Sequence, residues 1–369
     1  MHCPVGVKKG GANIERMDTW TLARAAALSL FVLQFVGGVA QPLVPAIFAF
    51  GDSAVDVGNN DYLTAAFRSD YPPYGKDFPS HQATGRFCNG KLATDFTADT
   101  LGFTSYAPPY LSPQASGSNL LIGANFASAG SGFYDGTSDA FNAIRLSQQL
   151  KYFREYRSKL AAVAGDQTSS SIISGALYLL STGTADFVQN YYSNPALSET
   201  LSPAQFSSLL VGSYAIFIRD LYGLGARRIG VTNLAPLGCL PATITLFGSG
   251  SDGCVSHLNE ATLEFNRQIN ASTASLARQL PGLKIVVFDL YRPLYDLVTK
   301  PADFGFFEAR KACCTTGTVK TSRYLCIPHS TGMCSNATGY VFWDTVHPTD
   351  AANQVISDSF LSQGGDLIF

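Results

Sequence analysis

The sequence predicts a single parallel α/β sheet, and two patterns support this prediction. Five short apolar runs have the length of buried strands, and longer segments with apolar residues at helical spacing lie among them. Strands that alternate with helices in this way are typical of a parallel sheet. The chain has 369 residues, of which 46% are hydrophobic and 14% are charged, so it is long enough to bury a large core.

Each predicted strand is a short apolar run, and the five runs cover residues 46–50, 120–126, 176–180, 228–234 and 284–288. Apolar residues at helical spacing predict helices over residues 146–160 and 206–222, a long mixed helix over 255–280, and a last helix that Pro348 opens and that runs through Phe360. Apolar stripes of this kind are typical of helix faces that pack on a core, so they need no functional role.

The first forty residues differ from the rest of the chain. Four basic residues precede an apolar run from Ala25 to Ala40, and the run ends in the small residues of Gly38-Val-Ala40. This pattern predicts a secretory signal sequence over residues 1–40 and a single domain over residues 41–369. We therefore expect a secreted, extracellular protein.

A membrane anchor is the alternative interpretation of this segment. No charged residue occurs between Ala25 and Gly51, which is long enough to cross a bilayer. Pro42 and Pro45 interrupt the run, however, and a spanning helix needs about 20 apolar residues. The sequence thus favours a cleaved signal, with no stable membrane insertion afterwards.

Composition also limits the partners and cofactors. The net charge of −2 and the pI of about 6.2 argue against a basic face for nucleic acid. Residues Gly248–Gly253 match the dinucleotide fingerprint in form, but they lie in a loop rather than between a strand and a helix, so we reject that motif. The histidines His81, His257 and His329 show no metal-ligand spacing. We expect no cofactor.

Cysteine usage agrees with export, because disulfides persist in oxidising compartments. We expect Cys239 to pair with Cys254, closing a loop of about 15 residues that is worth roughly 3 kcal/mol. The last four cysteines are expected to pair among themselves. Adjacent residues are poorly placed to bond to each other, so each of Cys313 and Cys314 is expected to reach Cys326 or Cys334. Cys88 is left over as a buried thiol.

Two glycosylation sequons lie in the predicted domain. They are Asn270-Ala-Ser and Asn336-Ala-Thr. In an exported protein both asparagines are candidate glycosylation sites, and we expect them on the surface.

Polar residues that follow the first strand, together with a pair near the C-terminus, predict the chemistry. Ligands bind at the carboxyl ends of the strands in open parallel sheets, and Ser53 follows the strand 46–50. A serine hydrolase needs a hydroxyl, a base and an orienting acid. Ser53 is the candidate nucleophile, His347 the candidate base, and Asp344 can fold back within one turn to hold the imidazole.

Each of these residues also has an ordinary structural explanation. Ser53 can simply end its strand as a turn residue, and His347 can be a plain residue ahead of the helix start at Pro348. The chain contains no Gly-x-Ser-x-Gly, so the usual nucleophile elbow is absent.

Longer motifs add specificity. The chain resembles the plant GDSL-type esterase/lipase family, within the SGNH hydrolase superfamily, from about Ile47 to Leu361. The motifs that carry the resemblance are Phe50-Gly-Asp-Ser-Ala-Val-Asp-Val-Gly-Asn-Asn60, Gly123-Ala-Asn-Phe-Ala-Ser-Ala-Gly130, Gly183-Thr-Ala-Asp-Phe187 with Asn190-Tyr-Tyr192, and Asp344-Thr-Val-His347, with further marks at Gly85–Lys91, Asn233–Pro241 and Cys313-Cys314.

The resemblance implies both a fold and an activity. The fold is a flavodoxin-like three-layer α/β/α sandwich with a five-stranded parallel sheet, and the activity is hydrolysis of carboxylic esters through an acyl-enzyme, without metal or cofactor. Ser53 matches the nucleophile, His347 the base and Asp344 the orienting carboxylate. The backbone N–H groups of Ser53 and Gly130 match two oxyanion-hole donors. The implied substrate is an acyl lipid or an acylated cell-wall component.

The chain departs from the family pattern at two positions. Ala54 stands where the family name expects Leu, which we interpret as a packing change. Ala185 stands where the third motif carries the Asn of the oxyanion hole, and loss of one such donor costs on the order of 10²–10³ in kcat. The hypothesis is a weakened or specialised esterase. An acyltransferase that uses the same acyl-enzyme and a catalytically silent binding protein are the alternatives.

Two further features have open interpretations. Asp186, beside Ala185, is expected to accept hydrogen bonds in a structural role. The aromatic run from Tyr71 to Tyr74, together with Phe78, either lines the substrate mouth or forms a packed loop.

Overall fold

The computed structural model describes residues 1–2, 41–250, 253–314, 325–328 and 333–369. The chain divides into two units, Met1–Gln41 and Pro42–Phe369. The predicted signal sequence falls almost wholly on residues outside those described, as do His329 and two residues of the Gly248–Gly253 motif. The second unit holds all the elements considered below.

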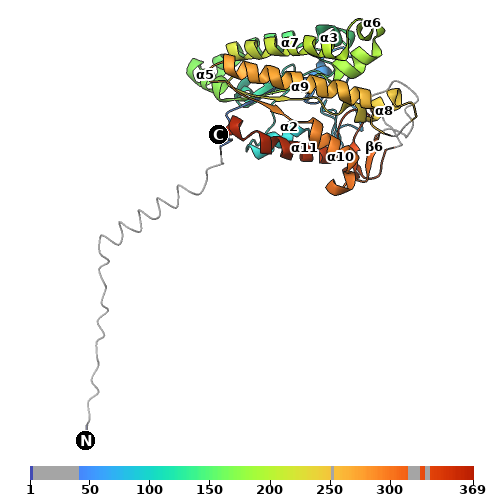
Figure 1. Cartoon of the computed structure of the whole chain (residues 1–369). Coiled ribbons are helices and arrows are strands. Elements are labelled where there is room, and N and C mark those ends of the chain that lie inside the picture. Colours follow the sequence, from blue (N-terminus) through green and yellow to red (C-terminus); the bar gives the residue numbers. More distant parts are fainter. Residues whose placement is uncertain (3–40, 251–252, 315–324, 329–332) are drawn as a thin grey trace. The chain divides into compact units, whose positions relative to one another are not determined.

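The second unit is built on a five-stranded, fully parallel sheet (Figure 1). Its strand order is β2-β1-β3-β4-β5, the flavodoxin-like doubly wound order. The prediction of one parallel sheet is therefore confirmed. The strands are β1 (Ile47–Gly51), β2 (Gly123–Asn125), β3 (Leu177–Ser181), β4 (Arg228–Thr232) and β5 (Lys284–Phe288).

The second predicted strand is shorter than its apolar run indicates. Residues 120–122 belong to a 3-10 helix, Gly117–Ile122, and the strand begins only at Gly123. Gly123 has a φ of 106°, and a Cβ there would lie 1.9 Å from the carbonyl oxygen of Ile47. Only glycine permits this close entry into the sheet, and an apolar run alone does not reveal it.

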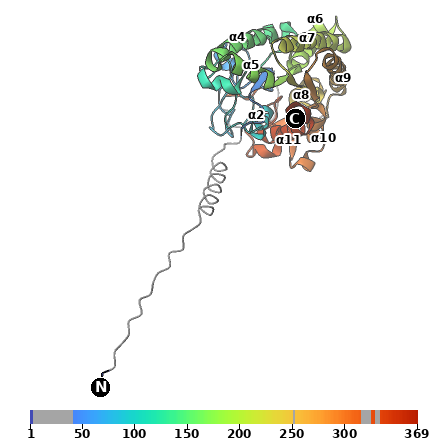
Figure 2. The same ribbon diagram turned by 90° about the vertical axis from the view of Figure 1, so that its left-hand side faces the viewer.

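Helices cover both faces of the sheet and complete the three layers. Figure 1 shows α7 and α9 on one side and α2 and α11 on the other, and Figure 2 gives the same layers from a second direction. Parallel sheets require this cover because both faces are apolar. One layer holds α4 (Leu146–Ala164), α5 (Asp166–Gly175), α7 (Pro203–Gly223) and α9 (Ser256–Gln279), and the other holds α2 (Ala93–Thr100), α10 (Tyr291–Thr299), α11 (Asp350–Gln363) and α12 (Gly365–Ile368).

The last long helix begins later than predicted. Its N-cap is Thr349, whose hydroxyl accepts a hydrogen bond from the N–H of Ala352 at 3.2 Å, and α11 runs from Asp350 to Gln363. A threonine cap satisfies one of the free N–H groups of the first turn. Pro348 instead forms a bridge to Phe342, so it precedes the helix rather than opening it.

Shorter elements surround the edge of the sheet where the strands end. A two-stranded sheet pairs β6 (Glu308–Ala312) with β7 (Tyr340–Phe342), and β7 leads directly into the segment that carries Asp344 and His347. The remaining elements are α3 (Asp135–Ala140), α6 (Pro195–Ser198), α8 (Pro241–Phe247), a π-helix at Asp186–Asn190, and 3-10 helices at Asn59–Tyr62, Tyr191–Ser193, Leu237–Cys239, Pro301–Phe304 and Ala337–Gly339.

Three disulfides join the six cysteines expected to pair. They are Cys239–Cys254, Cys313–Cys334 and Cys314–Cys326, so the geometry decides between the two pairings left open for the last four. Cys88 is a buried free thiol.

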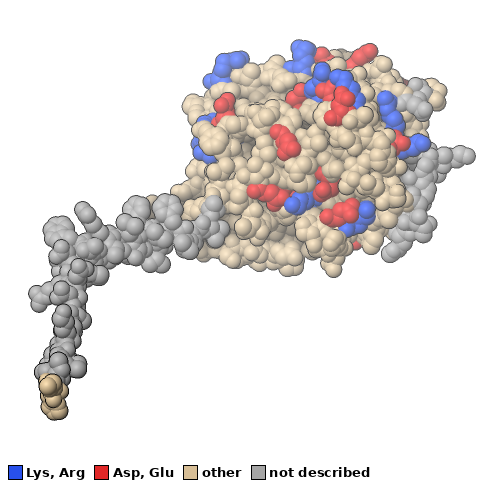
Figure 3. Space-filling view, turned by 90° about the horizontal axis from the view of Figure 1, so that it is seen from below, with Lys and Arg blue, Asp and Glu red and all other residues tan. Residues whose placement is uncertain are grey.

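On the face shown in Figure 3, acidic and basic side chains are intermixed among a large uncharged surface. Among the described residues, no helix combines the length and the apolarity needed to cross a bilayer.

Candidate active site

Ser53 lies on a tight turn that follows β1 at the carboxyl end of the sheet. The turn depends on Gly51, whose φ is 132° and whose added Cβ would lie 1.9 Å from the carbonyl oxygen of Ser181. Gln149 of α4 holds the same glycine from the other side. Its Oε1 accepts from the Gly51 N–H and its Nε2 donates to the Gly51 carbonyl, both at 2.9 Å. The serine is thus presented from a rigid backbone and remains half-buried.

His347 reaches Ser53 across 294 positions of sequence. Its Nε2 lies 2.7 Å from the Ser53 Oγ, and its Nδ1 lies 2.8 Å from Asp344 Oδ2 and 2.9 Å from Oδ1. Asp344 is fully buried, and its Oδ1 also accepts from the backbone N–H groups of Val346 and His347 at 2.9 and 2.8 Å. The structure therefore brings together the three side chains that the motifs singled out.

A fourth side chain completes the surroundings of Asp344. The Tyr74 hydroxyl donates to Asp344 Oδ2 at 2.8 Å and accepts from the N–H of Cys326 at 3.1 Å. Burial first, and then the Asp344 charge, raise the pKa of Tyr74 well above its ordinary value, so the phenol stays protonated as a donor. The sequence offered no sign of this contact beyond an aromatic run.

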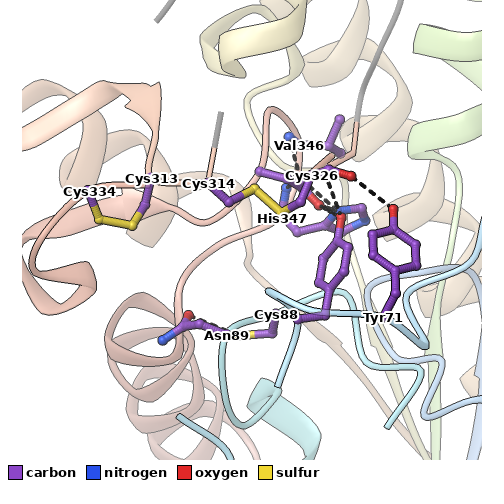
Figure 4. The surroundings of a disulfide bond; sticks show 11 residues. Tyr71, Cys88, Asn89, Cys313, Cys314, Cys326, Cys334, Val346 and His347 are labelled. Carbon is purple, nitrogen blue, oxygen red and sulfur yellow. Dashed lines mark hydrogen bonds and ion pairs between the residues drawn. A yellow bond between two sulfur atoms is a disulfide. The ribbon is translucent and has the colours of Figure 1, made fainter. Parts of the chain in front are cut away.

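The Cys314–Cys326 disulfide anchors this tyrosine. Figure 4 shows the cystine beside His347, with Tyr71 hydrogen-bonded nearby. The Tyr71 hydroxyl donates to the Cys326 carbonyl at 2.9 Å, while the Cys326 N–H donates to Tyr74. The peptide groups of one half-cystine thus fix two aromatic side chains, and one of them holds the buried carboxylate.

The predicted oxyanion donors lie on two adjacent loops. Among the described residues, no acceptor lies within hydrogen-bond reach of the backbone N–H of Ser53 or of Gly130. The loop that carries Gly130 is held by Asn60 and Asp56, which bond the Ala129 carbonyl at 2.9 Å and the Ala129 N–H at 3.0 Å. Burial raises the pKa of Asp56 to about 6.

Asp186 has the structural role expected of it. Its carboxylate accepts from the N–H groups of Phe133 at 2.7 Å and Tyr134 at 3.3 Å and from the hydroxyl of Thr137 at 2.7 Å. A Cβ at position 132 would lie 2.2 Å from Asp186 Oδ1, so Gly132 is needed for this approach. The contacts join the loop after β2 to the loop after β3. Burial raises the pKa of Asp186 to about 7.

Asp52 is the second buried carboxylate beside the serine. Its Oδ1 accepts from the Ala54 N–H at 3.0 Å, and burial raises its pKa to about 6 despite this bond. Asp52 therefore shapes the turn, and its carboxylate does not take the place of Asp344 at His347 Nδ1.

A cavity of about 360 Å³ opens beside Ser53 and His347. Ser53, Ala54 and His347 line its mouth, whereas Gly130 and Ala185 are not among its described lining residues. Ala54 is exposed, so the difference from the family at this position is not a change in core packing. That interpretation was wrong, because Ala54 is exposed and lines the cavity instead of packing in the interior.

The aromatic run Tyr71–Tyr74 forms a packed loop. Tyr74 is 1% exposed, and neither it nor Tyr71 or Phe78 lines the cavity beside Ser53. Both sequon asparagines are on the surface, Asn270 on α9 and Asn336 at the cap of a 3-10 helix. Among the described residues, no group of three His, Cys, Asp or Glu side chains is arranged to hold a metal.

Comparison with known proteins places the chain in a family. Residues 47–360 match the model of the GDSL-like Lipase/Acylhydrolase family. The chain is 56% identical to the GDSL esterase/lipase APG of Arabidopsis thaliana over 94% of this chain and 97% of that protein. Two other GDSL esterase/lipase proteins of Arabidopsis thaliana are 56% and 55% identical, over 89% and 90% of this chain and 91% and 94% of their own. The chain is therefore a member of the GDSL lipase/acylhydrolase family of carboxylic ester hydrolases.

Proposed function

We propose that this protein is a secreted serine esterase that cleaves carboxylic esters of lipid or cell-wall components. The observation that carries the proposal is the continuous pair of hydrogen bonds from Asp344 through His347 to Ser53. His347 Nδ1 lies 2.8 Å from Asp344 Oδ2, and His347 Nε2 lies 2.7 Å from Ser53 Oγ. Family membership supports the same chemistry.

The proposed reaction has two halves. His347 Nε2 takes the proton of Ser53 Oγ as the oxygen attacks the ester carbonyl, and the tetrahedral intermediate then expels the alcohol, which receives that proton. Water attacks the acyl-enzyme in the second half, again with His347 as base, and the acid leaves. Asp344 holds the imidazole in the orientation that both steps need.

In this proposal, the backbone N–H groups of Ser53 and Gly130 donate hydrogen bonds to the oxyanion of both tetrahedral intermediates. Ala185 offers no side-chain donor at the third position, so the proposed esterase works with a reduced oxyanion hole. Its kcat is accordingly expected to be low for short, activated esters.

Export is part of the proposal. The basic and apolar pattern of residues 1–40, the three disulfides and the two exposed sequons all suit an oxidising, extracellular site. Expression of the full chain with a C-terminal tag, followed by N-terminal sequencing of secreted protein, tests cleavage after Ala40.

The direct test of activity is a panel of acyl esters assayed on the wild type and on Ser53→Ala. Hydrolysis that disappears in the variant supports the proposal. Added glycerol separates hydrolysis from transfer, since a transferase yields acyl glycerol instead of free acid. Absence of any turnover in the wild type would leave a silent binding protein as the better account.

A further inference from the structure

The cavity beside Ser53 extends far below the catalytic pair. It continues between the sheet and the layer formed by α2, α11 and α12. Ser53 and His347 line one end, and Leu177 and Leu367 line the other, where the exposed residues Leu43 and Phe369 also border the cavity and leave it open. Leu177 begins β3 while Ser181 ends it, so the two ends lie at opposite edges of the sheet.

The depth of the cavity follows from the strand and helix geometry. Leu177, Leu179 and Ser181 project from one face of β3 into it, and four residues of strand span about 13 Å. On the opposite wall, α2 and α11 start beside the active site, where Asn353 Nδ2 donates to the Lys91 carbonyl at 3.1 Å. The two helices then run side by side away from it.

The two faces of β3 are packed differently. Tyr178, whose ring packs against Phe153 of α4, is 0% exposed, whereas Leu179 keeps 8% of its surface accessible although it lies on the central strand. A Cβ at position 230 would lie 2.2 Å from the Phe288 ring, so Gly230 lets that ring lie over β4 as a cavity wall. The space is therefore bounded by large apolar groups on the sheet side.

The chemistry of the lining is apolar from the mouth inward. Asp52, at the mouth, is the only acidic or basic residue, apart from His347, among the described lining residues. The inner part is formed mainly by leucine, isoleucine and phenylalanine side chains, with a few threonines between them, and its members include Leu101, Leu179, Phe360 and Thr97. An alkyl chain suits a space of this kind best, because each methylene that leaves water for it strengthens binding by up to about fourfold.

We propose that this cavity receives the acyl chain of the substrate and selects esters of medium-chain to long-chain fatty acids. The inference rests on the proposed function, because the ester carbonyl must sit at Ser53 for the chain to enter beside it. An extended chain with C–C bonds of about 1.5 Å advances about 1.25 Å per carbon, so about ten carbons fill the ~13 Å alongside β3. The alcohol part of the ester remains on the open side of Ser53.

Two Leu→Trp variants test the proposal. Leu179→Trp fills the cavity at half depth, and Leu263→Trp makes the same substitution on the exposed surface of α9, on the other side of the sheet. We would measure kcat/KM for water-soluble esters from acetyl to decanoyl, each below its micelle concentration. For the wild type, kcat/KM should rise roughly two- to fourfold per methylene up to about ten carbons.

The variants should then separate by chain length. Leu179→Trp should keep acetyl and butyryl activity within about threefold and lose at least tenfold on octanoyl and decanoyl esters, whereas Leu263→Trp should match the wild type throughout. A flat wild-type profile, or a long-chain preference that survives in Leu179→Trp, contradicts the proposal. If Leu179→Trp does not fold, Thr100→Trp, at an exposed lining position where α2 ends far from Ser53, makes the same comparison.

A binding measurement keeps this inference distinct from the proposed function. Ser53→Ala cannot turn over esters, yet its cavity is intact, so calorimetry should detect decanoic acid at least tenfold more tightly than hexanoic acid. If decanoate binds but the wild type hydrolyses no ester, the proposed esterase function is wrong and the assignment of the cavity to an acyl chain stands. If the wild type hydrolyses esters but decanoate does not bind, the esterase function stands and the assignment of the cavity is wrong.

Discussion

The hydroxyl of Tyr74 lies 2.8 Å from Oδ2 of Asp344, although the two residues are 270 positions apart. The contact gives the Asp344 carboxylate a hydrogen-bond donor in addition to the His347 imidazole and the backbone N–H groups of Val346 and His347. Because the N–H of Cys326 donates to the same hydroxyl, Asp344 is linked to the Cys314–Cys326 disulfide by two hydrogen bonds.

We predict that Tyr74→Phe lowers kcat about tenfold and leaves KM nearly unchanged. The variant removes a hydrogen bond to a charged, buried acceptor, worth about 1.5–3 kcal/mol, and loosens the carboxylate that orients His347. Steady-state kinetics on a short acyl ester checks this. Tyr71→Phe is the matched control, since it removes a hydroxyl bonded to the Cys326 carbonyl but not to Asp344, and it should stay within twofold of the wild type. Equal losses in both variants would show that the loop, rather than the contact with Asp344, is responsible.

The two neighbouring disulfides should differ in their effect on catalysis. Replacing Cys314 and Cys326 with serine frees the peptide that holds Tyr74, so kcat should fall several-fold at a temperature where the protein stays folded. Replacing Cys313 and Cys334 removes a disulfide from the same region, and no tyrosine of the described part of the chain is hydrogen-bonded to either of its half-cystines. Both double variants should lose stability of about 3 kcal/mol in the chain-entropy description, measured by denaturant unfolding. A kcat that falls equally in both would argue against the proposed linkage.

Ala185→Asn should raise kcat on short acyl esters by tenfold or more. An amide donor at this position restores the third contact to the oxyanion, and such a donor is worth about 10²–10³ in other hydrolases. Ala185→Leu, which adds similar volume without a donor, controls for packing and should bring no gain. An Ala185→Asn enzyme no faster than the wild type would mean that the oxyanion hole is already complete.

The free energy of unfolding should decrease as the pH rises from about 4 to about 7. Burial raises the pKa of Asp186 to about 7 and that of Asp52 and Asp56 to about 6, above the ordinary aspartate pKa of 3.8. In this window the folded protein binds protons that the unfolded chain has already released, so the loss is on the order of 1 kcal/mol per pH unit for each group. Thermal melts across the window should show a smaller decrease for Asp186→Asn than for Asp303→Asn, an exposed control. If stability decreases equally with pH in both variants, Asp186 does not contribute to the pH dependence of unfolding.

Sequence patterns predicted those parts of the fold that have a regular spacing of apolar residues or a short motif of characteristic residues. The run Lys284–Phe288 is a strand over its full length, because the β-branched side chains of Ile285, Val286 and Val287 favour extended backbone. Ser53, Asp344 and His347 were found because their motifs are short in sequence and their types fit one reaction. The start of β2 and the cap at Thr349 were missed, since a positive φ at Gly123 and a single side-chain cap do not alter hydrophobic periodicity.

The contacts that shape the site were beyond sequence reasoning for a different reason. Tyr74 meets Asp344 only after residues 270 positions apart are folded together, and nothing in the local pattern of Tyr71–Tyr74 favours a hydrogen bond over packing. The cavity below Ser53 is likewise a property of how β3, α2 and α11 pack. In the sequence Leu179 cannot be distinguished from a core leucine, and only the folded structure shows that 8% of its surface stays accessible.

The most direct test of the account is covalent labelling with an alkyl fluorophosphonate, which reacts with a serine only where a neighbouring base removes its proton. Peptide mass spectrometry should locate one adduct on Ser53, absent from Ser53→Ala and formed at least about 10³-fold more slowly in His347→Ala. An adduct on another residue, or equal labelling of all three proteins, would contradict the assignment of Ser53 as the nucleophile.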